Sequence, residues 1–361
     1  MAGHTLLAPQ EGYNLSEQGG LYVPRGLLEL SLKSMKSLEE ELAITITEPE
    51  EQISISDLNG GHDLILDRPT SLKLIPIKPV RDANVMVIGV DASCIKLGET
   101  CSGLITALRG AIVWRHGESC RYLRIGPLIF HITEHNKVEI YNALRDFCLG
   151  LTGRQEAPSL PYMPIKMANI FEHWMRELAC SLFSNALVLL DGSLSVGPGE
   201  AVGPLKTVLE LARSNSSVVM AISKNSKLRF MGKKLIDMLN GVPGPYLLEI
   251  GNRSLINASC IKLLGRTYVA RLSPLGCTFR LDIDMGVPRE AGIEAVRLLV
   301  ASDAVQQGYP EVLRLAHIIC TFTAPEVMAM QLALSRAYGL RIIRRPDVRR
   351  LLFGPFGSGG G

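Results

Sequence analysis

Two aspartates occupy matching positions after two apolar segments of the chain. Asp191 ends the run Ala186-Leu-Val-Leu-Leu and is followed by Gly192, where the chain can turn away. Asp91 follows Val85-Met-Val-Ile-Gly-Val90 in the same way. Short apolar runs bounded by turn residues indicate buried strands, and open α/β sheets place their chemistry at the carboxyl ends of strands. Two aspartates delivered by two such strands could converge on one divalent cation.

Such a pair suits phosphodiester hydrolysis, which needs a cation that neutralises the phosphate and activates water. Hard divalent cations prefer carboxylate oxygens, and the segment before the second strand offers Glu172 and Glu177. These glutamates are five positions apart on a predicted helix and diverge on its surface, so only one should face the aspartates. We favour Glu172 as the third carboxylate, and Glu177 stays the alternative.

Three further polar residues could complete the site. Lys224 follows the buried run 218–222 and could neutralise a phosphate oxygen as a point charge. Tyr309 and His317 are eight positions apart and would share roughly one face of a helix. His317 could bind the metal or transfer protons. The aspartates, the lysine and the histidine also have ordinary explanations. A strand-end aspartate often caps a turn, a lysine is usually solvated, and a histidine on an apolar helix is often a core residue.

The predicted elements around these residues favour a mixed α/β fold. Strands are expected at 85–90, 103–114, 122–132, 186–190, 218–222, 268–272 and 278–283, and helices at 134–149, 165–183, 205–213, 227–239, 288–301 and 325–338. Strands come first and then alternate with helices, which indicates a mixed sheet flanked by helices. An aspartate on the first central strand, a glutamate on the next helix and an aspartate ending the next strand is the layout of a ribonuclease H-like fold.

The sequence divides into three predicted regions. Residues 1–80 combine a helix over 24–43 with short alternating strands (44–47, 53–56 and 72–77) and several acidic residues, and could dock a partner. Pro76 would confine its strand to a sheet edge. Residues 81–353 hold the catalytic elements, and the glycine-rich end of 354–361 is typical of a flexible tail.

We expect a soluble, cytoplasmic protein with a large core. The 361 residues are 47% hydrophobic and 20% charged, with a net charge of +3. No apolar run reaches membrane-span length and no secretory signal precedes the first elements. The eight cysteines include no C-x-x-C pair, which argues against a zinc ribbon, and most lie in apolar surroundings. Two basic clusters, around 224–234 and 341–350, could contact the phosphates of a nucleic acid or form solvated helix faces.

Five segments, in order along the chain, together resemble the NurA nuclease family of archaea and some bacteria. They are Ile88-Gly-Val-Asp-Ala-Ser93, Leu189-Leu-Asp-Gly-Ser-Leu194, Ala221-Ile-Ser-Lys-Asn-Ser226, the hairpin 271–283, and Gly308-Tyr-Pro-x-x-Leu-x-x-Ala-His317. The resemblance implies a ribonuclease H-like core, a Mn²⁺ site in which Mg²⁺ can substitute, and a homodimer. It also implies partnership with a hexameric HerA-type translocase in resecting DNA double-strand breaks. The implied activities are 5′-to-3′ exonuclease and single-strand endonuclease, on single strands and duplex ends.

By position, the resemblance makes Asp91 and Asp191 metal-binding acids, gives Glu172 or Glu177 the helix acid, and matches Lys224, Tyr309 and His317 to the remaining polar positions. Ala92 stands where the family usually has glycine. Two alternatives stay open. An actin-like, ATP-binding phosphotransferase also has phosphate-binding loops that contain strand-end aspartates. The corresponding loops of this sequence lack the glycine- and threonine-rich runs that would bind phosphates. A catalytically silent NurA-like adaptor would keep only the binding surfaces.

Overall fold

The computed structural model describes residues 20–47, 64–66, 74–80, 83–197, 201–224, 226, 228–239, 241–250, 255–256, 261–303, 305–306 and 308–345. Its strands are β1 (Gly20–Tyr22), β2 (Ala43–Thr47), β3 (Leu64–Leu66), β4 (Leu74–Pro76), β5 (Met86–Glu99), β6 (Gly103–His116), β7 (Ser119–Thr133), β8 (Ala186–Asp191), β9 (Ser195–Val196), β10 (Val218–Ser223), β11 (Leu228–Phe230), β12 (Lys233–Lys234), β13 (Tyr246–Ile250), β14 (Leu255–Ile256), β15 (Lys262–Leu263), β16 (Gly265–Arg271), β17 (Thr278–Asp284), β18 (Val305–Gln306), β19 (Tyr309–Pro310) and β20 (Arg341–Arg345). Its helices are α1 (Arg25–Met35), α3 (Lys137–Leu149), α4 (Met163–Leu182), α5 (Gly203–Ser214), α6 (Leu235–Met238), α7 (Arg289–Ser302), α8 (Glu311–Cys320) and α9 (Ala324–Tyr338), with 3-10 turns η1 (Lys36–Glu40) and η2 (Leu160–Tyr162).

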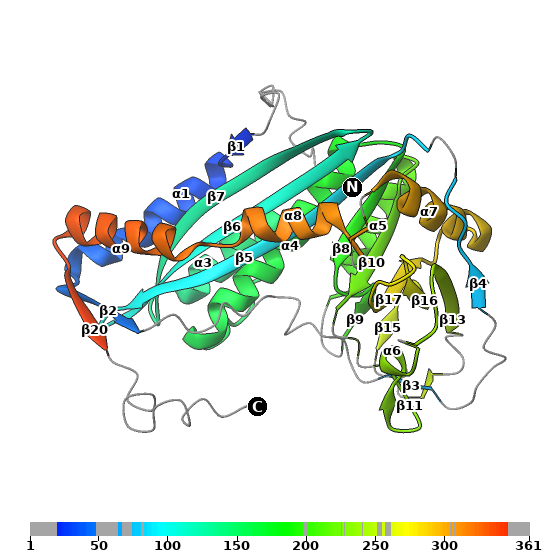
Figure 1. Cartoon of the computed structure of the whole chain (residues 1–361). Coiled ribbons are helices and arrows are strands. Elements are labelled where there is room, and N and C mark those ends of the chain that lie inside the picture. The colour runs from blue at the N-terminus through cyan, green and yellow to red at the C-terminus, as the bar shows by residue number, and fades with distance from the viewer. Residues whose placement is uncertain are drawn as a thin grey trace.

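Within these residues, twelve strands form one mixed sheet (Figure 1). Strands β5, β6 and β7 are an antiparallel meander, and β8 and β10 continue the sheet on the other side of β5, both parallel to it. Helix α4 precedes β8, and α5 links β8 to β10. Numbered along the chain, the five strands have the spatial order 3-2-1-4-5. This order is that of the ribonuclease H-like fold, as the sequence predicted.

The sheet separates two apolar cores with different helices. On one face, side chains of α1, α3, α4 and α5 pack with Val90, Ala92 and Leu190. On the other face, side chains of α7 and α8 pack with Val87, Leu187 and Leu189. Figure 1 shows the same division, with α8 in front of β5 and α4 behind it. Alternate residues of β5 and β8 therefore face different helices, as the alternation of side chains along a strand requires.

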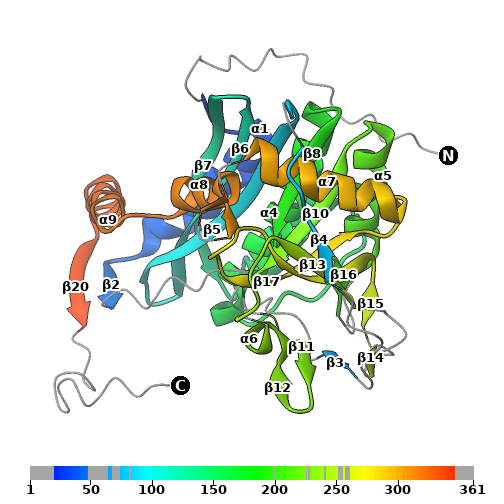
Figure 2. The same ribbon diagram turned by 45° about the vertical axis from the view of Figure 1, so that its right-hand side comes forward.

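Segment 227–239 was predicted as a helix, and that prediction was wrong. The chain forms β11, a turn, β12 and the short helix α6. Met231 and Gly232 have φ values of 48° and 78°, and two consecutive residues with positive φ close a tight hairpin. The hairpin belongs to a four-stranded sheet of described residues, β12-β11-β3-β14, at one end of the molecule (Figure 2).

The N-terminal segments are joined to the main sheet. The predicted helix over 24–43 ends earlier, because α1 passes into η1 and residues 43–47 form β2. Strand β1 pairs with β7, β2 pairs with β5 and β20, and β4 pairs with β13 at the sheet edge, where Pro76 was expected. The strand predicted at 53–56 and the tail at 354–361 lie outside the described residues. The domain boundary at residue 80 stays a prediction.

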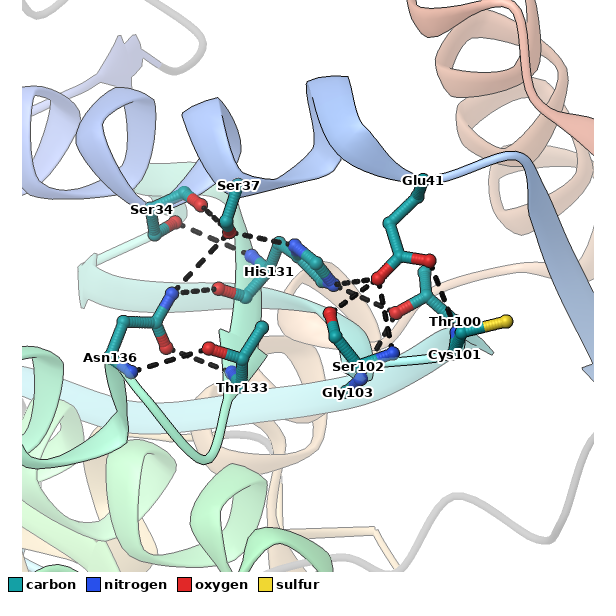
Figure 3. A network of polar contacts seen from close by, with 10 residues as sticks. All are labelled: Ser34, Ser37, Glu41, Thr100, Cys101, Ser102, Gly103, His131, Thr133 and Asn136. Atoms are coloured by element: carbon teal, nitrogen blue, oxygen red, sulfur yellow. Dashed lines mark hydrogen bonds and ion pairs between the residues drawn. The ribbon is translucent and has the colours of Figure 1, made fainter.

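A buried polar network fastens η1 to the meander (Figure 3). His131 is fully buried on β7, and its ring nitrogens lie 2.8 Å from Ser37 Oγ and 2.9 Å from Thr100 Oγ1. Glu41 accepts hydrogen bonds from the main-chain N–H groups of Cys101 and Ser102, both at 3.1 Å. The network satisfies polar groups that would otherwise be costly to bury, and so fixes η1 against the turn between β5 and β6.

By length and composition alone, Glu311–Tyr338 would also suit a membrane span. In the fold this stretch is two helices, α8 and α9, separated at residues 321–323. Apolar side chains of α8 join the core beneath it, and Phe322 and Leu334 pack with residues of β2, β5 and β6.

The seven cysteines that the structure describes are all free, and three of them (Cys148, Cys180 and Cys320) are buried.

Candidate active site

Asp91 and Asp191 lie next to each other on neighbouring parallel strands. The β5–β8 register pairs Val90 with Leu190, so the two aspartates are the next residues on their strands. Both are 7% exposed. Asp91 Oδ1 accepts a hydrogen bond from the main-chain N–H of Ala92 at 2.8 Å. The sequence thus predicted the adjacency of these two carboxylates correctly, although they are separated by about a hundred residues.

Asp91 does not end its strand, contrary to the sequence interpretation. Strand β5 continues to Glu99, whereas β8 ends at Asp191. Because β8 ends at Asp191, β5 has no neighbouring β8 residue beyond Asp91. Side chains from helices on both faces of the sheet can therefore approach Asp91. The continuous strand after Asp91 also leaves no loop there to enclose a nucleotide phosphate, which counts against the actin-like alternative.

His317 reaches Asp91 from α8. Its Nδ1 lies 2.8 Å from Asp91 Oδ2, and this hydrogen bond raises the pKa of His317. The close approach of α8 depends on Gly89, two residues before Asp91 and on the same face of β5. A Cβ atom at Gly89 would lie only 2.6 Å from the main-chain oxygen of Val312. Glycine therefore lets the helix backbone rest directly on the strand.

Lys224 and Tyr309 lie on the other side of the aspartate pair. Lys224 Nζ is 2.8 Å from Asp191 Oδ2 and 5.0 Å from the centre of the Tyr309 ring, within the range of a cation–π contact. Tyr309 was predicted to share a helix with His317, and that prediction was wrong. Tyr309 lies in β19. Gly308 has a φ of 87°, and the helix begins only after Pro310. Burial raises the pKa of Tyr309, and the charges of Asp191 and Asp91 raise it further.

Of the two helix glutamates, the structure brings Glu172 to the aspartates. Burial raises the pKa of Glu172 to about 7, Arg176 opposes that shift, and the charges of Asp91 and Asp191 add to it. Glu177 instead acts electrostatically on the buried thiols of Cys148 and Cys180. The five-residue spacing had separated the two glutamates, and packing of α4 on the sheet decided which one faces inward.

Arg176 is a residue of the site that the sequence analysis missed. It forms an ion pair with Glu172 one helical turn away, and it donates a hydrogen bond to the main-chain oxygen of Asp191 at 3.3 Å. Its side chain is only 11% exposed. The i, i+4 spacing of Glu172 and Arg176 was the signal available in the sequence. Arg176 thereby ties α4 to the end of β8.

The arrangement fits a divalent cation. Asp191 Oδ1 is buried, and it has no hydrogen-bond partner among the described residues. Ligand atoms of Asp91, His317 and Cys320 lie within 4.8 Å of one another. Buried carboxylates without full compensation are costly, and a cation is the usual way to stabilise them. Lys224 and His317 are 35% and 40% exposed, so the centre opens to solvent beside two groups that can carry positive charge.

The fold and these residues define a class of protein: a ribonuclease H-like domain with a buried, carboxylate-rich centre. The domain model of the NurA family matches residues 86–318, which span all five core strands and the predicted site residues. The chain therefore belongs to the NurA family and contains its nuclease domain. No similar sequence was found among curated proteins.

Similar solved structures include two of NurA and one of endonuclease V. The NurA nuclease from Sulfolobus solfataricus is 13% identical, with 74% of this chain and 87% of that chain covered and a TM-score of 0.44. A NurA structure bound to dAMP and manganese is 10% identical, with 74% and 90% covered and a TM-score of 0.38. Endonuclease V from Streptomyces avermitilis is 13% identical, with 80% and 99% covered and a TM-score of 0.31.

Proposed function

We propose that the protein is a Mn²⁺-dependent DNA nuclease, with Mg²⁺ as a possible substitute, acting as a 5′-to-3′ exonuclease and a single-strand endonuclease. The observation that carries this proposal is the placement of Asp91 and Asp191 side by side, with His317 and Glu172 approaching from opposite faces of the sheet. A bound divalent cation would neutralise phosphate charge and lower the pKa of water.

The protein groups have separate roles in this proposal. Asp91, Asp191, Glu172 and His317 would hold the cation. Lys224, exposed on one side and paired with Asp191 on the other, stabilises charge on the scissile phosphate. Tyr309 keeps its proton at neutral pH, since its pKa is raised further above an ordinary value of 10, and its hydroxyl can donate a hydrogen bond.

Family membership supports a further proposal about the biological setting. We place the protein in the cytoplasm, as a homodimer that works on single strands and duplex ends with a HerA-type hexameric translocase during double-strand break resection. The N-terminal region offers a surface for such a partner, because Leu28, Leu32 and Leu42 expose 40%, 58% and 85% of their surface. Exposed apolar side chains concentrated on one segment are typical of interaction sites.

Replacing Asp191 by asparagine tests the catalytic proposal. Asparagine has the same shape but lacks the charge, so Asp191→Asn should fold normally and lose cleavage of single-stranded and duplex DNA. Cleavage is measured with Mn²⁺, with Mg²⁺ and with EDTA, and folding is measured by thermal unfolding. We expect the wild-type protein to cleave with Mn²⁺ and to stop with EDTA.

Asp237→Asn is a matched control, because Asp237 lies on α6, outside the aspartate pair. This variant should cleave like the wild type. Full activity of Asp191→Asn would refute the assignment, and an inactive wild-type protein under every metal condition would favour the silent adaptor.

A further inference from the structure

We infer that Cys320 is a thiolate ligand of the cation centre, so that Asp91, His317 and Cys320 form a mixed oxygen, nitrogen and sulfur site for thiophilic cations such as Zn²⁺, Co²⁺ and Cd²⁺. The inference rests on the proposed function for the centre itself. It adds a ligand and a selectivity: thiophilic cations bind here and compete with Mn²⁺ for Asp91 and His317.

The position of Cys320 carries the first part of the argument. It is the last residue of α8, three positions after His317, so the two side chains share a helix face. Cys320 is fully buried, and its Sγ donates a hydrogen bond to the main-chain oxygen of His317 at 3.3 Å. The thiol therefore lies beneath the half-exposed imidazole and beside the Asp91 carboxylate.

The spacing of the ligand atoms carries the second part. Bonds from Zn²⁺ are about 2.0–2.1 Å to nitrogen or oxygen and about 2.3 Å to sulfur, so ligands of one tetrahedral ion lie about 3.3–3.8 Å apart. The ligand atoms of Asp91, His317 and Cys320 all lie within 4.8 Å of one another, which small side-chain rotations would bring to that spacing. His317 Nδ1 and Asp91 Oδ2 are already 2.8 Å apart.

A fourth ligand is available on the neighbouring strand. Asp191 Oδ1 is buried and has no hydrogen-bond partner in the part of the chain that the structure describes. Asp191 lies beside Asp91, because the β5–β8 register pairs the preceding residues, Val90 and Leu190. An unpartnered buried oxygen on the residue beside Asp91 points to a cation at this centre.

The chemistry of sulfur decides which cations would bind more tightly with Cys320 as a ligand. A thiol that binds a cation forms a metal–sulfur bond and releases its proton to solvent, and soft thiolates favour Zn²⁺, Co²⁺ and Cd²⁺ over Mn²⁺. Zn²⁺ binds most nitrogen and oxygen sites more tightly than Mn²⁺ in any case. Inhibition by Zn²⁺ alone is therefore not diagnostic, whereas a difference between wild type and Cys320→Ser is.

Co²⁺ binding to the full-length protein tests the inference, because a thiolate ligand gives a near-ultraviolet charge-transfer band. We expect this band in the wild type and its loss in Cys320→Ser and Cys320→Ala. In competition titrations, Cys320→Ser should bind Zn²⁺ about tenfold more weakly or worse, the scale on which changes around a metal alter its affinity. Mn²⁺ binding, followed by electron paramagnetic resonance, should change little.

Cys180→Ser is the matched control, since Cys180 is equally buried but lies on α4 near Glu177. It should keep the charge-transfer band. Co²⁺ binding without the band in the wild type, or a band that survives in Cys320→Ser, would overturn the inference. Failure of the proposed function is distinguishable, because then the wild-type protein would neither bind Mn²⁺ nor cleave DNA.

Discussion

At the scale of single residues, the centre is an arrangement of charges that only partly neutralise one another. Burial raises the pKa of Asp191, Lys224 opposes the shift, and the charge of Asp91 adds to it. Lys224 is the partly exposed member of this group, so it can contact an incoming phosphate while it remains near Asp191. Its charge should therefore contribute more to the transition state than to folding.

Lys224→Met should lower the rate of DNA cleavage by about a hundredfold, the cost of removing one preorganised electrostatic contact. Methionine keeps much of the aliphatic stem and removes the ammonium group. Single-turnover cleavage with Mn²⁺ measures the effect, and Lys224→Arg should recover part of the rate.

Lys206→Met is the control, because Lys206 pairs with Glu210 on the surface of α5, where an exposed ion pair contributes little. It should cleave at the wild-type rate. An equal loss in both lysine variants would mean that general charge, and not the position of Lys224, supports cleavage.

At the scale of elements, the site depends on how closely two helices approach the sheet. Phe171 and Met175 of α4 pack on the face that holds Val90, and Val312 and Leu313 of α8 pack on the opposite face. The termination of β8 at Asp191 lets side chains from both helices meet. Helix positions were predicted from apolar spacing, but the spacing says nothing about the distance between helix and strand.

Gly89→Ala should displace α8 and disrupt the contact between His317 and Asp91. The added Cβ would meet main-chain atoms of Val312 and Leu313 at 2.6–2.9 Å, and main-chain atoms of a packed helix yield only by moving the helix. We expect a loss of about 1–3 kcal/mol in the free energy of unfolding, the usual cost of overpacking. Urea denaturation measures this loss, and Mn²⁺ titration should show weaker binding because His317 moves away from Asp91.

Gly153→Ala provides the control, because no atom lies within 4 Å of a Cβ placed there. It should leave both stability and Mn²⁺ affinity close to wild type. Wild-type Mn²⁺ affinity in Gly89→Ala would show that His317 does not depend on the close contact.

At the scale of the whole molecule, the N-terminal helical segment is part of the sheet's framework. The network around His131 connects η1 to β7 and to the turn after β5 (Figure 3). Burial lowers the pKa of His131 below its usual 6.5. Burial alone would raise the pKa of Glu41, but hydrogen bonds from Ser102, Thr100 and Cys101 together lower it below 4.5.

Both shifts make the fold less stable in acid. The unfolded chain takes up a proton on His131 below about pH 6.5 that the folded protein resists, so stability falls as pH drops from there toward the folded pKa. Glu41 adds a second loss as pH falls below about 4.5. Glu172 acts in the opposite direction, because burial raises its pKa to about 7 and the folded protein takes up this proton more readily than the unfolded chain. The contribution of the His131 network is therefore measured as the difference in melting temperature between the wild type and network variants from pH 8 to pH 4.

His131→Gln should lose less stability than the wild type, or gain more, between about pH 7 and pH 5, because it removes the histidine that the folded protein keeps unprotonated. Glu41→Gln should show such a difference only below about pH 5. A slope above pH 5 that is unchanged in His131→Gln would contradict the assignment of acid sensitivity to this network.

The sequence by itself determined the five core strands, the β16–β17 hairpin, most of the helices and the two aspartates, because these follow from apolar periodicity and from local chain geometry. It did not reveal β1, β13 and β20, which also join the main sheet. It also supported the ribonuclease H-like plan, since the chain order of strands limits their pairing. The helix predicted over 227–239 failed because apolar spacing did not reveal the turn at Met231 and Gly232. Only the tertiary structure decided that Glu172 rather than Glu177 faces the aspartates and that β19 rather than a helix carries Tyr309. It also decided that Arg176 and Cys320 lie close to the aspartates. Those outcomes depend on the rotation and depth of packed helices, which long-range contacts fix and local sequence does not.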